Sequence, residues 1–234
     1  MKKNNMNKII TNIDKELNID DDLYIEYSNS NKEIVINIKD NSNVVINIIK
    51  ENTKDKVIYN IGKNASLIVN KLVIDNSDTI DINLKENSSV TYNYSSINYK
   101  DNEYKINVYH NDRNTNSRIV NHGVNVDNNN LDFIVNGIIY KDSINCICNQ
   151  DNKIISMKDN HANIKPNLII DNNEIEANHS AYIGTFKEDE MFYLMSRGIN
   201  KKNCYKLLLK AFLLNNMQIE SEKFVNIIDT LGGE

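Results

Sequence analysis

Short stretches of alternating apolar and polar residues dominate the chain between residues 23 and 184. They are seen at 33–38, 105–109 and 133–135, where Ile and Val fill most of the apolar positions. A period of two residues places every second side chain on the same face of a strand, and β-branched residues suit the pleated, half-buried surface of a sheet. The pattern predicts a mainly β core over residues 21–184.

A short motif that begins with asparagine recurs within this core. Residues 41–47, 64–70 and 87–93 resemble one another, and their starts are 23 residues apart each time; a weaker copy at 116–121 is out of phase by a few residues. Such a period, made of two short strands and two turns, is typical of a solenoid whose coils stack to bury their apolar faces. The signature of leucine-rich repeats is absent. We therefore predict a right-handed parallel β-helix, with chance similarity as the alternative.

The N-terminal residues follow a helical period instead. Apolar residues recur at spacings of three and four, which places them on one face of an amphipathic helix. The residues of this stripe are Met6, Ile9, Ile10, Ile13 and Leu17. We predict a short N-terminal helix within residues 1–20, covering one end of the core.

Residues 185–234 predict a C-terminal helical domain. Thr185 and Glu188 have the spacing of a capping box ahead of a helix over 188–197, and Gly198 stands at its C-cap. Asn200 can cap a second helix, and a third short helix is expected over 222–230. The apolar stripe of the second helix consists of Cys204, Leu207, Leu208, Ala211 and Phe212.

Charge and length restrict the classes of partner. The 234 residues carry a formal net charge of -5, whereas nucleic-acid binders usually have a basic footprint. The sequence has no apolar run approaching the about 18 residues of a membrane span and no secretory signal at its start. Three cysteines, an odd number, do not make a disulfide framework. We expect a cytoplasmic protein with no nucleic-acid partner and no membrane partner.

Asparagine and isoleucine are unusually frequent, with 45 and 36 residues against 5 alanines. Their codons are rich in A and T, so we attribute this bias mainly to the genome. Both residues are poorer helix formers than alanine or leucine, which agrees with a β core.

The sequence has few motifs that carry chemistry by themselves. It has no phosphate-binding glycine loop, no HExxH, no CxxC and no GxSxG, which speaks against a self-contained nucleotide hydrolase, a metalloprotease or an α/β-hydrolase. Cys146 and Cys148 share one face of a predicted strand, either as two soft metal ligands or as two small apolar core residues. His179 lies where the predicted solenoid gives way to the helices, and it is either a functional or a purely structural histidine. Cys204 is expected to pack inside the helical stripe.

The segment that begins at residue 178 carries a more specific pattern. It reads NHSAYIG at 178–184 and EDEMFYLMSRGI at 188–199. This resembles the C-terminal signature of the SufB/SufD family of iron–sulfur cluster assembly scaffold proteins, in which a His-Gly-Ala-x-x-Gly segment precedes an acidic helix start and Phe-Tyr-Leu-x-Ser-Arg-Gly-Ile. The segment 165–170 resembles the Pro-x-Leu-x-Ile strand of that family, and 121–139 resembles an earlier family segment more loosely.

The resemblance implies a β-helix followed by C-terminal helices, in a scaffold subunit that is not an enzyme. It implies that the helices dock a SufC-like ABC-type ATPase. It also implies that the β-helix pairs with a SufB-like paralogue or with a second copy of the chain. An iron–sulfur cluster would form transiently at that subunit interface, with no tightly bound cofactor.

The same resemblance assigns candidate residues. His179 occupies the position of the family's histidine and is the candidate cluster ligand, because neutral imidazole suits iron. In a homo-oligomeric scaffold, Cys146 or Cys148 would supply the sulfur ligand. The candidate residues for binding the ATPase partner are Phe192, Tyr193, Arg197, Gly198, Leu208 and Phe212.

The chain departs from the family pattern at several points. Ser180 replaces the usual glycine, Ala177 stands where a cysteine is frequent, and the region around Asp151 lacks the cysteine of SufB-type chains, so the chain is SufD-like. The sequence shows no counterpart of most of the family's helical N-terminal region, so we expect a short form of the family. A polysaccharide-binding β-solenoid is a further alternative, which would require paired carboxylates on one face, whereas acidic residues such as Asp75 and Asp101 fall in predicted turns.

Overall fold

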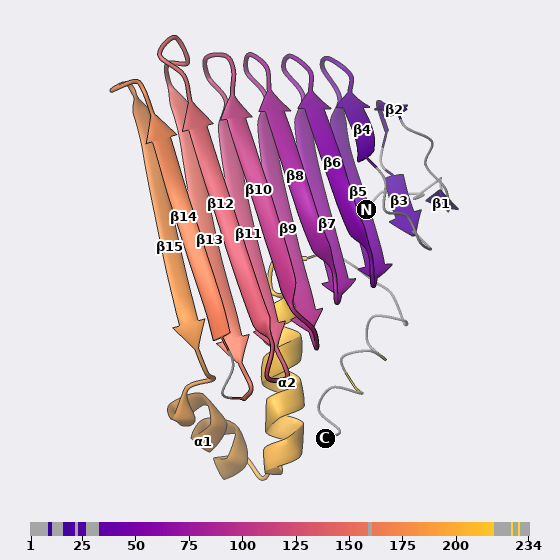
Figure 1. Ribbon diagram of the computed structural model, residues 1–234, viewed down its shortest axis with the longest axis vertical. Helices are drawn as coiled ribbons and strands as arrows, with labels where there is room; N and C mark the ends of the chain where they lie inside the picture. Colours follow the sequence, from indigo (N-terminus) through magenta and orange to yellow (C-terminus); the bar gives the residue numbers. More distant parts are fainter. Residues whose placement is uncertain are drawn as a thin grey trace.

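The computed structural model describes residues 9–10, 16–21, 23–26, 33–158 and 161–217, together with Asn226 and Asp229. In these residues the chain alternates between two sheets of parallel strands (Figure 1). The odd sheet contains β1 (Ile9–Ile10), β3 (Leu23–Glu26), β5 (Asn43–Glu51), β7 (Ser66–Ile74), β9 (Ser89–Asn98), β11 (Asn116–Asn125), β13 (Cys146–Ser156) and β15 (Ile175–Gly184). The even sheet contains β2 (Glu16–Ile19), β4 (Glu33–Ile38), β6 (Lys54–Ile61), β8 (Ser77–Leu84), β10 (Asn102–His110), β12 (Asn130–Ile139) and β14 (His161–Ile170).

Each coil contributes one strand to each sheet, and every strand pairs with the strand two positions away in the sequence. The result is a parallel β-solenoid, which confirms the predicted architecture. Alternate side chains point between the two sheets, as the burial pattern of β8 and β12 shows. The interior is mostly isoleucine, valine and leucine, with a stacked pair of Tyr94 and Tyr104 whose ring centroids lie 3.8 Å apart.

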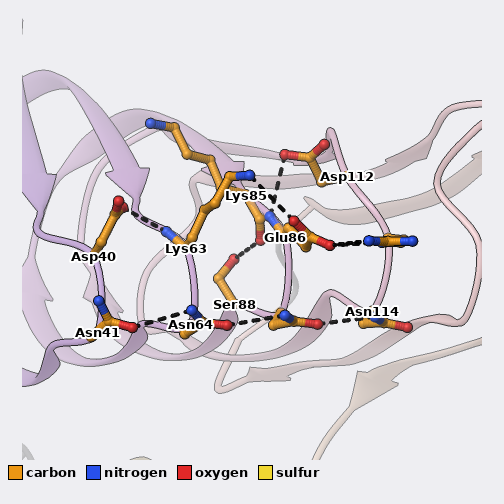
Figure 2. Close-up of polar contacts among 11 residues, drawn as sticks. Asp40, Asn41, Lys63, Asn64, Lys85, Glu86, Ser88, Asp112 and Asn114 are labelled. Carbon is orange, nitrogen blue, oxygen red and sulfur yellow. Dashed lines mark hydrogen bonds and ion pairs between the residues drawn. The ribbon is translucent and has the colours of Figure 1, made fainter.

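The repeated motif marks the turn that precedes each of β5, β7, β9, β11 and β13. Its first residue is an asparagine with a positive φ between 54° and 61°, a left-handed conformation that asparagine tolerates better than other non-glycine residues. The side-chain amides of these asparagines form a row of hydrogen bonds along the edge of the solenoid (Figure 2). The row is Asn41, Asn64, Asn87, Asn114 and Asn145.

This row also explains the weaker fourth copy. The spacing between bonded asparagines is 23 residues for the first two steps, then 27 and then 31. Asn116 nevertheless pairs in register with Ser89, so the additional residues are accommodated outside the paired strands. The stacking of the coils is therefore retained where the sequence period changes.

The predicted N-terminal helix is wrong in the described part of this region. Ile9–Ile10 and Glu16–Ile19 are strands, while Met6 and Ile13 of the predicted stripe lie outside the described residues. β2 pairs in parallel with β4, and Ile19 is buried. Because isoleucine favours strands and the neighbouring coil offers hydrogen-bond partners to the backbone, strand pairing outweighs the helical spacing.

Two helices follow the solenoid, α1 (Glu188–Ser196) and α2 (Lys201–Leu214). They lie at one end of the strands (Figure 1). α1 begins at the predicted residue, but the predicted capping box is wrong. The N-cap is Lys187, which makes no side-chain capping bond, so Thr185 lies two residues too early to cap.

The other predicted helix ends are confirmed. Gly198 follows α1 with a φ of +85°, and its N–H donates to the carbonyl of Met195 at 3.0 Å, as at a left-handed helix end. The side chain of Asn200 caps α2 by accepting from the N–H of Asn203 at 2.9 Å. The predicted third helix lies outside the described residues except for Asn226 and Asp229, which are both helical.

α2 packs against β9 and β11 of the odd sheet. Its buried residues are Cys204, Leu209 and Leu213, whereas Leu207 and Ala211 of the predicted stripe are exposed. The helix carries leucines on more than one face, so its spacing alone did not identify the face that the sheet covers. The hydroxyl of Ser95 donates to the carbonyl of Leu213 at 2.7 Å and helps to fix the end of the helix on the sheet.

Candidate functional site

His179 lies in the middle of β15, the last strand of the odd sheet. β15 pairs with β13, and His179 is the register partner of Gln150. In-register residues of parallel neighbours share a face, so His179 is on the same face as Gln150. Because no further strand of the described residues follows β15 in the sheet, the side chain of His179 is exposed.

Cys146 and Cys148 lie on β13 and are both buried. The Sγ atom of Cys146 is 3.1 Å from the hydroxyl of Thr115. Cys148 packs so closely against Gly137 that a Cβ atom at that glycine would lie 2.6 Å from its Sγ atom. Burial raises the pKa of the Cys148 thiol, which keeps it protonated and unreactive.

The structure does not join these residues into a closed metal site. Cys146 and Cys148 are the register partners of Ile175 and Ala177. Both thiols therefore lie nearer the start of the paired strands than His179 does. Among the described residues, no group of three or more His, Cys, Asp or Glu side chains is placed to hold a metal ion. His179 is exposed on an edge strand, and the two thiols belong to the interior of the solenoid.

The surface around His179 is polar on one side. A recess of about 180 Å³ is lined by residues of β11, β13 and β15, among them Arg118, Asn178 and Asp151. Ser180 donates a hydrogen bond to the carboxylate of Asp151 at 2.7 Å. Partial burial raises the pKa of Asp151, but the hydrogen bonds from Ser180 and Lys153 outweigh it, so the pKa lies below its ordinary value.

β14 and β15 form the last coil and leave apolar side chains uncovered. Each of the two strands has one paired neighbour in its sheet among the described residues. We call this region the end surface, and its members are Ile169, Ile170, His179, Tyr182 and Ile183, all of them exposed. An edge that combines free backbone groups with apolar side chains is suited to pairing with another chain.

A second exposed region lies on α1. Phe192 is 74% exposed and Tyr193 is 57% exposed, and Met195 is exposed as well. The guanidinium carbon of Arg197 lies 5.2 Å from the ring centroid of Tyr193, and Arg197 donates a hydrogen bond to the Tyr193 hydroxyl at 3.2 Å. We call Phe192, Tyr193, Met195 and Arg197 the helix surface. Gly198 follows it and is exposed too.

The remaining predicted contact residues, Leu208 and Phe212, are half-buried. They line a groove of about 550 Å³ between the helices and the odd sheet, together with Lys153, Tyr182 and Phe186.

Sequence reasoning missed the contact that secures α2. Nδ1 of His122 donates to the carbonyl of Phe212 at 2.7 Å, and the two rings stack with centroids 4.5 Å apart. Burial lowers the pKa of His122. These residues are 90 positions apart, so no local pattern could reveal the contact.

Comparison with known proteins decides the family. A family model described as the SufBD core domain of the SUF system for FeS cluster assembly matches residues 17–212. The chain belongs to the SufBD family. The match includes both sheets from β2 onward, α1 and most of α2, so the solenoid and the two helices are together features of this family.

Curated relatives from this family are similar over shorter segments. The iron–sulfur cluster assembly protein SufD of Bacillus subtilis is 29% identical over 117 residues, which is 47% of this chain and 27% of that protein. A SufBD family protein of Pyrococcus horikoshii is 41% identical over 58 residues, 24% of this chain and 13% of the relative. SufD of Escherichia coli is 31% identical over 62 residues, 26% of this chain and 15% of the relative.

The matched segments thus span 27% or less of these relatives. Within the SufBD family, the chain is SufD-like. No helix in the described part of the chain is long and apolar enough to cross a membrane.

Proposed function

We propose that this chain is a non-enzymatic scaffold subunit of a SUF-type complex in the cytoplasm, on which an iron–sulfur cluster is assembled and then passed on. The observation that carries the proposal is the match of the SufBD core domain to residues 17–212, together with an exposed His179 on the last strand of the solenoid. The cluster is the cargo of the complex and is held only transiently. Metals and clusters of this kind are bound by neutral imidazole and by thiolate.

The end surface is the proposed site of pairing with a SufB-like chain. Its uncovered strands could continue the two sheets into a partner, and Ile169, Ile170, Tyr182 and Ile183 supply apolar area for such an interface. His179 lies within this surface, so a cluster bound there would be held between two subunits. A ligand set completed by the partner agrees with the lack of a closed metal site in the described residues.

The burial of both strand cysteines bears on the choice of partner. A homo-oligomer would have to supply its thiolate from Cys146 or Cys148, and both are enclosed in the interior. The raised pKa of Cys148 further disfavours the thiolate, which is the form that binds metal. We therefore favour a SufB-like paralogue as the source of the sulfur ligand over a second copy of this chain.

The helix surface is the proposed docking site for a SufC-like ABC-type ATPase. Phe192 and Tyr193 are large aromatic residues that the fold leaves exposed, and such residues often carry most of the energy of an interface. The contact of the Arg197 guanidinium with the Tyr193 ring, worth about 0.5–1 kcal/mol at an exposed site, favours the observed orientation of the tyrosine. In this arrangement ATP is hydrolysed by the partner, and the solenoid links the helices to the cluster interface.

Co-purification tests this docking directly. Tagged wild-type chain is expected to capture the ABC-type ATPase of the same organism, and the Phe192→Ala, Tyr193→Ala double variant is expected to capture at least about tenfold less. Tyr140→Ala serves as the matched control, because Tyr140 is an exposed aromatic residue outside the helices. Equal capture by the double variant and the control would contradict the proposed site.

A further inference from the structure

Gln150 is a buried amide with one hydrogen-bonding atom unused. It lies on β13, is 4% exposed, and its Nε2 donates to the backbone carbonyl of Asn167 on β14 at 3.3 Å. Its Oε1 is buried without a hydrogen-bond partner. The reverse orientation of the amide would place Oε1 against the carbonyl oxygen of Asn167, so the Asn167 contact determines which atom is left over.

A buried carbonyl oxygen without a donor costs free energy, typically about 1–3 kcal/mol, unless a donor is supplied. The residues that flank Gln150 on its own strand face do not supply one. The sulfur of Cys148 accepts hydrogen bonds from the side chains of Ser117 and Gln150, so this contact uses the Gln150 N–H and leaves its Oε1 without a donor. The Asn152 side-chain N–H donates to the carbonyl of Ser180. We therefore look for the donor to Oε1 on the neighbouring strand β15.

His179 is the residue that the register brings beside Gln150. Adjacent strands are about 4.8 Å apart, so side chains on the same rung and the same face are within hydrogen-bonding reach of each other. The His179 ring lies on an edge strand and is exposed, which leaves it room to turn toward the amide. Either ring nitrogen of a neutral imidazole can carry the proton and donate.

We propose that Gln150 is a positioning residue for His179: its Oε1 accepts a hydrogen bond from one ring N–H and thereby selects a single tautomer. The other ring nitrogen then presents its lone pair at the end surface, where iron would bind. Histidine ligands of metals generally donate their second N–H to such an acceptor, which fixes the orientation of the ring. The hydrogen bond is a property of this chain alone, and only the identity of the metal rests on the proposed function.

The tautomer of His179 in the full, metal-free chain tests the inference. Long-range ¹H–¹⁵N correlation spectra of ¹⁵N-histidine protein, recorded at about pH 8.5 where an ordinary imidazole is neutral, show which nitrogen carries the proton. The His179→Asn variant assigns the signals. We expect one dominant tautomer in the wild type and a change of at least about fivefold in the tautomer ratio in Gln150→Met, which keeps the side-chain length and removes the carbonyl acceptor.

Two further variants make the outcome decisive. Gln150→Glu keeps an acceptor at the same place and is expected to retain the wild-type tautomer if Gln150→Met does not fold. Asn121→Leu removes a buried amide from β11, which does not pair with β15, and is expected to leave His179 unchanged. An unchanged tautomer ratio in Gln150→Met, or an altered one in Gln150→Glu, would overturn the inference.

The proposed function can fail separately. If His179 does not bind the cluster, replacing it leaves the cluster content of the complex unaffected. The tautomer ratio is measured on the metal-free chain and therefore tests the Gln150 hydrogen bond independently of cluster binding. If both hold, Gln150→Met is expected to bind the cluster about 10–100-fold less tightly than the wild type in competition with a chelator, the usual cost of removing a partner of a metal-binding histidine.

Discussion

At the scale of single residues, asparagine has a specific structural role where the backbone turns. The abundance of asparagine suggested codon bias, yet its positions follow the geometry of the coils. Asn64 has a φ of 54°, donates through its side chain to Asn41 and accepts from Asn87. One residue type thus both adopts the left-handed turn and bonds to the turns above and below it.

A substitution at Asn64 separates these two contributions. Asn64→Gly keeps the left-handed turn and loses the amide bonds, so a loss of about 1 kcal/mol in the free energy of unfolding is expected. Asn64→Ala loses both and is expected to cost about 1–2 kcal/mol more than the glycine variant. Urea unfolding measures the difference. Equal stability of the two variants would show that the backbone conformation at this turn costs nothing.

His110 is a buried histidine that the fold holds neutral. Its Nδ1 lies 2.7 Å from the Thr115 hydroxyl and its Nε2 2.9 Å from the Ser117 hydroxyl. Burial lowers the pKa of His110 to about 4. The unfolded chain binds this proton near pH 6.5, so stability from His110 is complete above that pH and is lost as the pH falls toward 4.

The expected size of this effect is about 3 kcal/mol between pH 7 and pH 4. His110→Asn removes the titrating group, so its stability should fall less over this range than that of the wild type. Urea unfolding at several pH values measures it, with the exposed His161→Asn as the control. Parallel pH profiles for the wild type and His110→Asn would contradict the account.

At the scale of elements, strand pairing and helix caps decide where the sequence could be interpreted correctly. The 23-residue repeat predicted the solenoid because each copy forms the same turn and the same strand in successive coils. These strands then pair with one another in register. Gly198 and Asn200 predicted helix ends because their chemistry is local. The stripe of α2 and the N-terminal helix were misjudged because their structure depends on the sheet they meet, which local spacing does not contain.

The orientation of α2 leads to a direct test. Leu209→Ala removes a fully buried side chain from the contact with the odd sheet and is expected to cost about 2–4 kcal/mol in the free energy of unfolding. Leu207→Ala, on the same helix, removes a side chain that is 47% exposed and is expected to cost less than about 0.5 kcal/mol. If the Leu207 variant were the less stable one, the helix would face the sheet with its predicted stripe instead.

At the scale of the whole molecule, the two exposed regions are neighbours, because α1 follows β15, the last strand of the odd sheet, after a short connection. The helix surface lies on α1, and the end surface lies on the last coil (Figure 1). Sequence resemblance identified His179 and the aromatic residues of α1 as candidates. It could not show that His179 is exposed or that Cys146 and Cys148 are enclosed. Both facts depend on β15 being the last strand of the odd sheet, because β15 covers β13 and is itself left uncovered.

The central claim is that this chain contributes His179 to a cluster held between two SUF subunits. The most direct test is the iron and sulfide content of the complex, purified anaerobically after co-expression with the SufB-like chain and the ABC-type ATPase. The account predicts that His179→Ala still assembles the complex but retains at least about tenfold less cluster, whereas the control His161→Ala retains the wild-type amount. Wild-type cluster content in the His179→Ala complex would contradict it.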